Sequence, residues 1–546
     1  MRTAHAVADV RAAERDLMAL VPDGELMRRA AAGLAAVCVR VLGRVYGARV
    51  AVLAGAGDNG GDALFAGARL AGRGARVTAI ATGPRLHEAG ARALTAAGGT
   101  VLGGTVLGGT VLGGMVVGGT VLSGAAAGGP GTGAGPAADV RGEAWADAAA
   151  AIGSADLILD GILGIGGHGG LREPAAELAG LTARARAAGA VVVAVDLPSG
   201  VDADTGEVAG AAVAADLTVT FGTIKPGLLI DPGAGRSGAV ELVDIGLRPH
   251  LAGRAVAARA LQAEDVTGLL PAPGAESNKY RRGVLGVLAG SERYTGAAVL
   301  SVGAAVHGGA GMVRLVSAAR AADVVRQHWP EAVITEVDPA DPAAAVAAAG
   351  RVQAWAAGPG LGTGPAATAM LGAVLATPLP VLLDADALTV LAGRRDLLAR
   401  PDGAPTVITP HAGELSRLIG ADIADIEARR AEFARRAAAD LGVTVLLKGS
   451  TTVVATPDPA APVLVNPTGT AWLATAGSGD VLTGLTGALL AQGVRPVASA
   501  AAAAAYLHGL AGRLAASGAP IGASDLLAAI GPAIRVVTGG SAAGLG

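Results

Sequence analysis

The stretch WLATAGSGDVLTGLTGALL, residues 472–490, places an acid directly after a glycine cluster and just before an apolar, helix-like run. Gly477, Ser478 and Gly479 can turn backbone N–H groups toward an anion, and a helix N-terminus adds positive partial charge there. In a site that only binds phosphate, the negative charge of Asp480 would repel the ligand. The combination is typical of a site where a hydroxyl group loses its proton beside a phosphoryl group.

Short β-branched runs alternate with Ala-rich helical stretches along the whole chain, in two halves that meet near residue 255. That alternation predicts an α/β fold, with parallel sheets and crossover helices in each half. The expected strands are 49–55, 75–81, 157–160, 191–197 and 217–221 in the first half, and 284–290, 312–317, 352–358, 381–388, 406–414 and 443–449 in the second.

Composition narrows the class of protein. Apolar residues make up 52% of the 546 residues, which is enough to bury large cores, and the net charge of −3 gives no electrostatic basis for binding nucleic acid. The single cysteine, Cys38, allows no internal disulfide and indicates a reducing compartment. The first residues do not read as a signal peptide, and no apolar run reaches the ~20 residues of a membrane helix. We expect a soluble cytoplasmic protein.

One segment breaks the alternation. From Thr100 to Leu122 the chain repeats the unit TVLGG, and a Gly-rich stretch follows. A period of five is too short for the known solenoid repeats, and such Gly-rich repeats are usually insertions. We predict a surface loop over about 100–138, while the Val and Leu content leaves an ordered apolar hairpin as the alternative.

Polar residues follow the first expected strand. The sequence LAGAGDNGGDALFAGARL, residues 53–70, has the form of a glycine-rich strand–helix turn, which by itself is weak evidence for a dinucleotide site. It also carries Asp58, Asn59 and Asp62, which a phosphate cradle does not require. Oxygen-bearing side chains at the carboxyl edge of a parallel sheet suit a cation or a ligand hydroxyl.

Two further strands of the first half end on acids. Asp160 ends the strand before a Gly-rich loop, and Asp196 ends the next one, with Ser199 beyond it. Each acid alone is as easily a helix N-cap or a turn residue. Together with the first loop they converge on one crevice, as the strand ends of a doubly wound sheet do. Lys225, after a fourth strand, is expected either on the surface or facing a phosphate.

At these motifs the first half resembles the epimerase domain of the NAD(P)H-hydrate repair enzymes. The motifs are GDNGGDA (57–63), LDGILGIGGHGGLR (159–172), DLPSGVDADTG (196–206) and TFGTIKPGLL (220–229). The resemblance implies a Rossmann-like parallel-sheet domain over 1–253 that interconverts the two C6 epimers of NAD(P)HX. Asp58 departs from the family, which often has an amide there, and Ala63 and Gly161 are altered neighbours.

The same resemblance implies the site residues of the first half. A potassium ion would be held by Asn59, Asp160 and Ser199, and Asp160 is also our candidate catalytic base. The residues implied to contact NAD(P)HX are Asp58, Asn59, Gly60, Gly61 and Asp62, then Gly164, Ile165, Gly166, Gly167, His168, Gly169 and Gly170, and finally Asp196.

In the second half, small residues and one cation follow the strand ends. Lys448 leaves the last expected strand in LLKGSTTVVA (446–455), a composition that suits a nucleotide phosphate. Asp384 and Asp386 follow another strand, and His411 lies in TPHAGE (409–414). Taken alone, His411 is more typical of an N-cap or core histidine. The other polar residues at neighbouring strand ends favour a functional role for it. Thr409 and Glu414 are candidates for placing water or a cation.

The second half resembles the dehydratase domain of the same repair enzymes, which has a ribokinase-like α/β fold. The resemblance rests on SNKYRRGVLGVLAGSERYTGAA (277–298), GPGLGTG (358–364), LDADAL (383–388), TPHAGEL (409–415) and NPTGTAWLATAGSGDVLTGL (466–485). It implies a domain over 254–546 that phosphorylates the C6 hydroxyl of (6S)-NAD(P)HX from ADP, with Mg²⁺, and then loses phosphate.

The resemblance also implies residue roles in this second half. Asp480 would be catalytic, and the substrate would contact Ala298, Gly360, His411 and Asp480. The nucleotide would be held by Lys448, Gly449, Ser450, Thr451, Thr452 and Gly479.

Two other functions remain open from the residues alone. One is a ribokinase-like kinase of a small alcohol or vitamin precursor, because the GSGD motif by itself does not exclude it. The other is that the first half only binds a ligand. The leading hypothesis is a bifunctional repair enzyme that binds NADHX, NADPHX and ADP, forms a homo-oligomer, and binds neither nucleic acid nor membranes.

Overall fold

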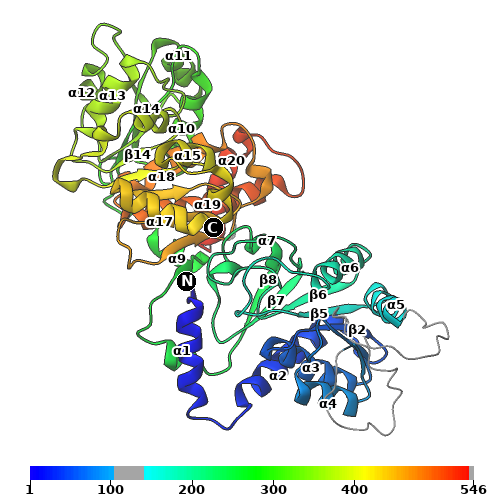
Figure 1. Ribbon diagram of the computed structural model, residues 1–546. Helices are drawn as coiled ribbons and strands as arrows, with labels where there is room; N and C mark the ends of the chain where they lie inside the picture. The colour runs from blue at the N-terminus through cyan, green and yellow to red at the C-terminus, as the bar shows by residue number, and fades with distance from the viewer. Residues whose placement is uncertain (104–139, 540–546) are drawn as a thin grey trace, which may run out of the picture. The chain divides into compact units, whose positions relative to one another are not determined.

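The computed structural model describes residues 1–103 and 140–539 (Figure 1). The chain divides into two compact units, one formed by Ala4–Ala255 and the other by Met1–Thr3 together with Val256–Gly546. Most of the TVLGG repeat lies outside the described residues, so the loop expected there stays a prediction. The first three residues of the repeat, Thr100–Leu102, form the short strand β4.

The unit Ala4–Ala255 is built on a seven-stranded sheet in the order β4-β3-β2-β5-β6-β7-β8, in which all neighbouring strands are parallel. Because the strand order reverses between β2 and β5, the carboxyl ends of these two strands open the crevice where doubly wound folds bind ligands. The remaining strands of this sheet are β2 (Arg49–Ala54), β3 (Arg76–Ala81), β5 (Leu157–Gly161), β6 (Val191–Val195), β7 (Leu217–Phe221) and β8 (Ala239–Val243).

Helices cover both faces of this sheet. Alternate residues of β2 point to opposite layers: Val50 and Val52 pack in the core with α2 and α3, whereas Ala51 and Leu53 pack with α5 and α6. Figure 1 shows α2, α3 and α4 on one side of the strands and α5 and α6 on the other. The helices are α1 (Val7–Met18), α2 (Glu25–Leu42), α3 (Asp58–Ala71), α4 (Glu88–Ala96), α5 (Val140–Gly153), α6 (Ala175–Ala187), η1 (Pro226–Leu228), α7 (Ala234–Ser237) and α8 (Arg248–Leu251).

The second unit contains an eleven-stranded sheet in the order β1-β9-β18-β17-β16-β15-β14-β13-β10-β11-β12. The pairs from β12 to β16 are parallel, and β17 is antiparallel to both of its neighbours. The strands are β1 (Arg2–Ala4), β9 (Ala258–Ala260), β10 (Val284–Leu288), β11 (Met312–Ser317), β12 (Val333–Glu336), β13 (Ala354–Ala357), β14 (Val381–Leu383), β15 (Thr406–Ile408), β16 (Thr444–Leu447), β17 (Thr452–Ala455) and β18 (Val463–Asn466).

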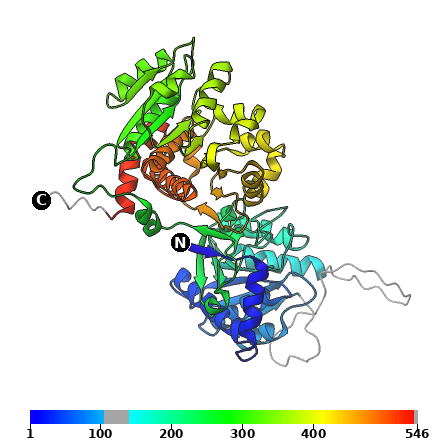
Figure 2. The same ribbon diagram turned by 90° about the vertical axis from the view of Figure 1, so that its left-hand side faces the viewer.

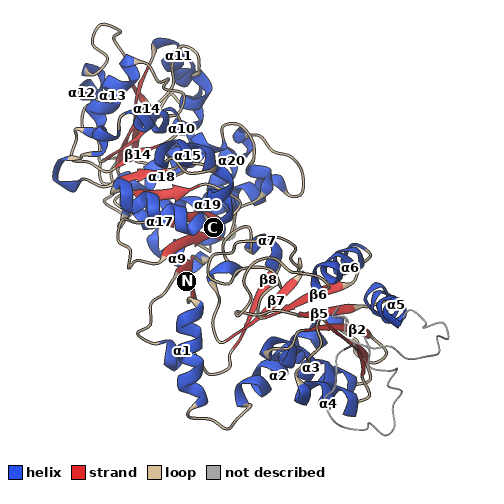
Figure 3. Cartoon of the chain, viewed as in Figure 1, coloured by secondary structure: helices blue, strands red, loops and turns tan. Residues whose placement is uncertain are grey.

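Helices again lie on both sides of the strands (Figure 3). The C-terminal helices α18, α19 and α20, orange to red in Figure 2, pack against one another, and α18 is the most buried of the three. No helix in the described ranges is long and apolar enough to cross a bilayer. The helices are α9 (Ala263–Leu269), α10 (Thr295–His307), α11 (Ala319–His328), α12 (Ala344–Ala348), α13 (Pro365–Leu375), α14 (Asp386–Gly393), η2 (Arg395–Leu398), η3 (Pro401–Gly403), α15 (Ala412–Ile419), α16 (Ile423–Ala428), α17 (Arg430–Leu441), η4 (Ala471–Leu473), α18 (Ser478–Ala491), α19 (Val497–Ala516) and α20 (Ala523–Val537).

The expected strands are all present, and the α/β class is confirmed for both halves. Two expected strands were drawn too long, because the chain turns into α14 at Asp386 and into α15 at Ala412. Seven further strands, all of five residues or fewer, were not expected from the sequence: β1, β4, β8, β9, β12, β17 and β18.

Helix α18 approaches α10 closely because glycine stands at the contact. A Cβ atom at Gly484 would lie 2.1 Å from the backbone oxygen of Ser301 in α10, which is nearer than any side chain tolerates. Gly487, one turn later, leaves the same room for Leu285 of β10, since a Cβ there would lie 2.9 Å from the leucine methyl. The glycines of this helix therefore set how deeply it packs, and with it the position of the GSGD motif at its N-terminus.

We predict that Gly484→Ala destabilises the second unit by about 1–3 kcal/mol, the usual cost of overfilling a packed interface. Thermal unfolding followed by circular dichroism measures the change. The matched control is Gly268→Ala in α9, where an added Cβ meets nothing within 4 Å and the residue is exposed. Equal unfolding temperatures for the two variants would contradict the close-contact explanation.

Candidate active sites

The GSGD motif lies at the N-terminus of α18. Gly477 precedes the helix with φ +87°, a conformation that glycine adopts without strain. A Cβ atom at Gly479 would lie 3.6 Å both from Asp384 Oδ2 and from Lys448 Nζ, so this glycine borders the two charged groups directly. The structure thus brings the motif together with Lys448, as the sequence indicated.

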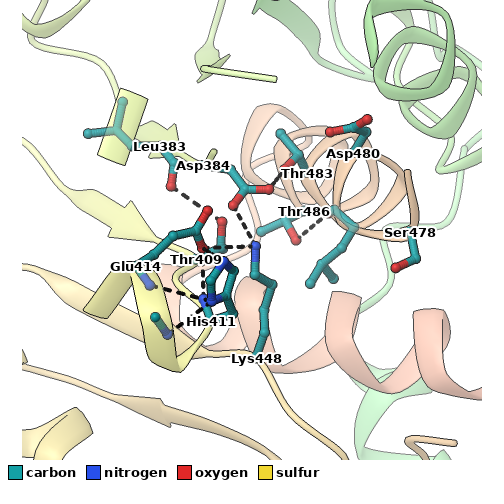
Figure 4. A network of polar contacts seen from close by, with 12 residues as sticks. Leu383, Asp384, Thr409, His411, Glu414, Lys448, Ser478, Asp480, Thr483 and Thr486 are labelled. Atoms are coloured by element: carbon teal, nitrogen blue, oxygen red, sulfur yellow. Dashed lines mark hydrogen bonds and ion pairs between the residues drawn. The ribbon is translucent and has the colours of Figure 1, made fainter. Parts of the chain in front are cut away.

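Lys448 is held by a polar network that joins four elements (Figure 4). Its Nζ atom lies 2.8 Å from Asp384 Oδ1 and 3.5 Å from Glu414 Oε2. Thr483 of α18 donates a hydrogen bond of 2.7 Å to the other oxygen of Asp384. Burial alone would lower the pKa of Lys448, but the charges of Asp384 and Glu414 outweigh it and raise the pKa. Lys448 is therefore a fixed cation at the end of β16.

The Asp480 carboxylate is partly exposed, and within the described residues it has no hydrogen-bond or ion-pair partner. In Figure 4 it lies outside the dashed network around Lys448. Its pKa is raised to about 7, first by burial and then by the charges of Asp384 and Asp386, with Lys448 opposing them. An open carboxylate with such a pKa is suited to accept a proton near neutral pH.

His411 is the N-cap of α15, one of the two interpretations left open by the sequence. Its Nδ1 accepts a hydrogen bond of 3.0 Å from the Gly413 N–H. Glu414 closes the capping box by accepting from the His411 N–H at 2.8 Å. More than half of the imidazole surface is exposed, so its other face is open to a ligand. Thr409, in contrast, is buried and donates to the Leu383 carbonyl oxygen.

The other expected substrate contacts lie where β10 and β13 end. Ala298 of α10 is fully buried, and a Cβ atom at Gly290, just after β10, would lie 2.9 Å from its methyl group. Gly360 has φ +60°, and a side chain there would press on Tyr294 at 2.9 Å. Ala298 is therefore closed off from solvent in this structure, whereas Gly360 is partly exposed and has no side chain to fill the space beside Tyr294.

The expected nucleotide segment is the turn between the antiparallel strands β16 and β17. Gly449 and Ser450 are exposed, whereas Thr452 is buried at the start of β17. Arg430 of α17 donates a hydrogen bond of 2.5 Å to the Lys448 carbonyl oxygen and lies against Gly449. Arg430 was not expected from the sequence, because nothing in the Arg-rich segment before β16 distinguishes it as the residue that folds back onto Lys448. Thr483 was not expected either, because in the sequence it is one hydroxyl residue within an apolar, helix-like run.

In the first unit the loop after β2 enters α3 by close backbone packing. A Cβ at Gly60 would lie 2.1 Å from the Gly55 carbonyl oxygen, so only glycine fits this turn. Asn59 projects toward the loop after β5, where a Cβ at Gly164 would lie 3.1 Å from the amide oxygen. The Nδ2 atom of Asn59 is buried and has no hydrogen-bond partner among the residues that the structure describes. The two Gly-rich segments therefore adjoin at the switch point of the sheet.

Asp160 and Ser199 lie together beneath these loops. Asp160 accepts hydrogen bonds from the Ser199 hydroxyl at 2.6 Å and from the Ser199 N–H at 2.8 Å, and both residues are fully buried. No cationic side chain of the described residues contacts Asp160, and burial raises its pKa to about 6, although the bonds from Ser199 oppose this. A buried carboxylate without a counter-ion, beside hydroxyl and amide oxygens, fits a monovalent cation.

Asp196 is held in the left-handed region, with φ +64°, at the end of β6. Its Oδ1 lies 2.5 Å from Lys225 Nζ and also accepts hydrogen bonds from the Thr220 hydroxyl and the Phe221 N–H. Lys225 is 1% exposed. Neither expectation for this lysine was right: it lies neither on the surface nor free to meet a phosphate, because it neutralises Asp196 inside the core.

The rim of this site comes from the Gly-rich loop and from α1. His168 of the loop is exposed, with Nδ1 at 3.3 Å from Asp202 Oδ2. A Cβ at Gly166 would lie 3.3 Å from a guanidinium nitrogen of Arg11. The sequence analysis did not assign Arg11 or its neighbour Glu14 to the site, because nothing in the amphipathic pattern of α1 distinguishes them.

Two family models match this chain. NAD(P)H-hydrate dehydratase matches residues 285–532, and YjeF-related protein N-terminus matches residues 23–106 and 132–227, so the second model skips most of the repeat. The bifunctional NAD(P)H-hydrate repair enzyme of Mycobacterium tuberculosis is 46% identical over 92% of both chains. The chain belongs to the family of bifunctional NAD(P)H-hydrate repair enzymes.

Other members and one solved structure are also similar. The repair enzyme of Mycobacterium leprae is 44% identical over 95% of both chains. The NAD(P)H-hydrate dehydratase of Bacillus subtilis, co-crystallised with ATP and Mg²⁺, is 32% identical, with a TM-score of 0.46, and the match covers 50% of this chain and 97% of that one. Because both halves match the repair-enzyme family, a kinase fused to a non-catalytic module is not favoured.

We predict that Lys225→Met destabilises the first unit by about 3–5 kcal/mol, the usual cost of leaving one partner of a buried ion pair uncompensated. The double variant Lys225→Met/Asp196→Asn is expected to recover much of that loss, because it removes both charges. Denaturant unfolding of Lys225→Met, Asp196→Asn and the double variant gives the coupling between the residues. Additive losses in the double variant would contradict a paired role.

Proposed function

We propose that the second unit dehydrates (6S)-NADHX and (6S)-NADPHX at the expense of ADP, giving AMP and phosphate, and that the first unit interconverts the 6R and 6S epimers. The proposal is carried by one observation: the open Asp480 carboxylate stands beside a glycine-built helix N-terminus and the fixed cation Lys448. Family membership supports both activities.

The geometry supports a separate role for each residue of the dehydratase site. Asp480 accepts the proton of the C6 hydroxyl as that oxygen attacks the β-phosphoryl group of ADP. The N–H groups of Gly477 and Gly479 and the Lys448 ammonium stabilise the charge on the phosphoryl oxygens. The phosphate then leaves C6 with its bonding electrons, and loss of a proton restores the reduced nicotinamide. His411 and Gly360 border the space for that ring.

For the nucleotide we propose the turn Lys448–Thr452 with Gly479, and Mg²⁺ bound with ADP. Among the described residues no group of three or more His, Cys, Asp and Glu side chains is arranged to hold a metal. This supports a magnesium ion held mainly by phosphate oxygens and water, which is its usual preference. The preference for ADP over ATP rests on the family resemblance.

For the first unit we propose a potassium ion held by Asn59, Asp160 and Ser199, which would supply the positive charge that Asp160 lacks. We propose NAD(P)HX contacts from residues 58–62, residues 164–170 and Asp196. The complete burial of Asp160 supports its role as a cation ligand more than its role as the catalytic base.

We also propose that the enzyme acts in the cytoplasm as a homo-oligomer. The single cysteine, which is buried, suits a reducing compartment. Light scattering of the purified protein measures its mass in solution and so tests the proposed homo-oligomer.

A single assay tests both activities. Purified protein is mixed with both NADHX epimers, ADP and Mg²⁺, and the absorbance of reduced nicotinamide is followed. Recovery from both epimers is expected. Consumption of the S epimer alone would contradict the proposed epimerase activity. Nucleotide hydrolysis without recovery of NADH would contradict the proposed dehydratase activity.

Asp480→Asn is expected to lower the dehydratase kcat by a factor of about 10²–10⁴, the usual contribution of a positioned general base. Epimerisation is expected to stay at the wild-type rate because the two sites belong to separate units. Asp440→Asn, an exposed acid of α17, is the matched control. Loss of both activities in Asp480→Asn would contradict separate sites.

The dehydratase kcat/KM is expected to rise with pH through about 7 and then level off, because the base acts in its ionised form and its pKa is raised to about 7. Asp384→Asn removes a negative charge that raises this pKa, so the midpoint is expected to move to lower pH, together with a lower plateau. A midpoint that stays in place or moves upward would argue against Asp480 as the titrating group.

A further inference from the structure

Asp62, in the first turns of α3, is a buried carboxyl group of which one oxygen is left unsatisfied by the residues that the structure describes. The residue is 8% exposed, and its Oδ1 atom is buried without a hydrogen-bond partner in the described part of the chain. A carboxyl group left in that state costs free energy, and the fold does not recover the cost internally. Such a group is suited to act on a ligand that enters the crevice between β2 and β5.

The charged groups that face Asp62 come from several elements. Asp58 lies on α3 itself, Asp196 follows β6, Lys225 follows β7 and Glu14 projects from α1. Burial raises the pKa of Asp62 well above its usual value, the three acids raise it further, and Lys225 opposes them. Glu14 is half-buried on α1, one turn after Arg11, whose guanidinium lies 3.3 Å from a Cβ atom placed at Gly166 of the Gly-rich loop. Burial raises the pKa of Glu14, and the charges of Lys225 and Arg11 oppose this. The site thus holds two carboxyl groups that retain a proton more readily than ordinary acids.

Two other acids of the site, Asp160 and Asp196, are already engaged. Asp160 is fully buried and both of its oxygens accept hydrogen bonds from Ser199. Asp196 is paired with Lys225 and accepts two further hydrogen bonds through the same oxygen. Asp58 is exposed. Asp62 therefore combines burial, a free oxygen and a place at the switch point of the sheet.

We propose that Asp62 is the general acid of the epimerase and that Glu14 accepts the proton of the returning water. This assignment rests on the proposed epimerase function. It extends the expected binding role of Asp62 to proton transfer, and it brings α1 into the catalytic machinery.

The chemistry follows from C6, which bears both the hydroxyl group and the ring nitrogen N1. Neutral Asp62 gives its proton to the hydroxyl, the C6–O bond breaks with its electrons on oxygen, and water leaves. The N1 lone pair forms an N1=C6 double bond, whose positive charge the Asp62 carboxylate now faces. Water then adds to the opposite face of C6, the double-bond electrons return to N1, and Glu14 takes the surplus proton. In the reverse direction the two carboxyl groups exchange roles.

The first test is Asp62→Asn in the full chain, assayed without ADP by chromatographic separation of the two epimers. We expect the epimerase kcat to fall by about 10²–10⁴, with KM changed only a few-fold because the amide keeps the shape. Asp62→Glu is expected to recover part of the rate, and Asp23→Asn, an exposed acid of the same unit, to leave it unchanged. Dehydration of the pure S epimer is expected to be normal in all three.

A wild-type kcat in Asp62→Asn would overturn this assignment while leaving the epimerase function intact. Failure of the wild-type chain to equilibrate the epimers would overturn the proposed function itself. A raised KM with kcat unchanged would reduce Asp62 to a binding group and would also overturn the assignment.

The second test uses ¹⁸O-labelled water and Glu14→Gln. Cleavage of the C6–O bond requires that each epimerisation exchange the C6 oxygen with solvent, so the product epimer is expected to carry ¹⁸O. Inversion with full retention of the original oxygen would overturn the mechanism. Glu14→Gln is expected to lower kcat at least tenfold, and an unchanged kcat would overturn the role of Glu14.

Discussion

The ion pair between Lys448 and Asp384 is the interaction on which the second site depends. Asp384 ends β14, Lys448 ends β16, Glu414 belongs to α15 and Thr483 to α18, so one cation fixes four elements at the same sheet edge. The pKa of Asp480 is raised to about 7 first by burial and then by the negative charge of Asp384, which the two contacts of Asp384 hold in place, while Lys448 opposes this. The same ion pair therefore contributes to both the architecture of the site and its acid–base behaviour.

The first unit also buries carboxylates at the edge of a parallel sheet, and it treats two of them differently. At Asp196 the counter-ion is built in, since Lys225 lies 2.5 Å away in the core. At Asp160 the described residues provide hydroxyl and backbone donors but no cationic side chain, which is why we propose a potassium ion there. The contrast separates a charge balanced within the fold from a charge that the proposed ion would balance.

The sequence predicted the α/β class and the strand ends, because β-branched runs that end in Asp or Gly are local signals. It placed Asp160, Asp196, Lys448 and Asp480 at strand or helix termini, where the structure has them. Contacts made across the fold were beyond it: the pairing of Lys225 with Asp196 and the support of Lys448 by Thr483 arise only from tertiary packing. Short strands such as β4 and β12, three and four residues long, carry too few residues for a periodic pattern.

The strand β1, Arg2–Ala4, lies at the edge of the sheet of the second unit and neighbours β9. The polypeptide consequently leaves and re-enters that unit, with Ala4–Ala255 forming an excursion between the two points. The first unit is therefore an insertion in the second unit and not a domain that precedes it in the sequence. Proteolytic cleavage near residue 255 would break only one of the two connections between the units. A fragment that starts after this point would lack β1, the edge strand of its own sheet.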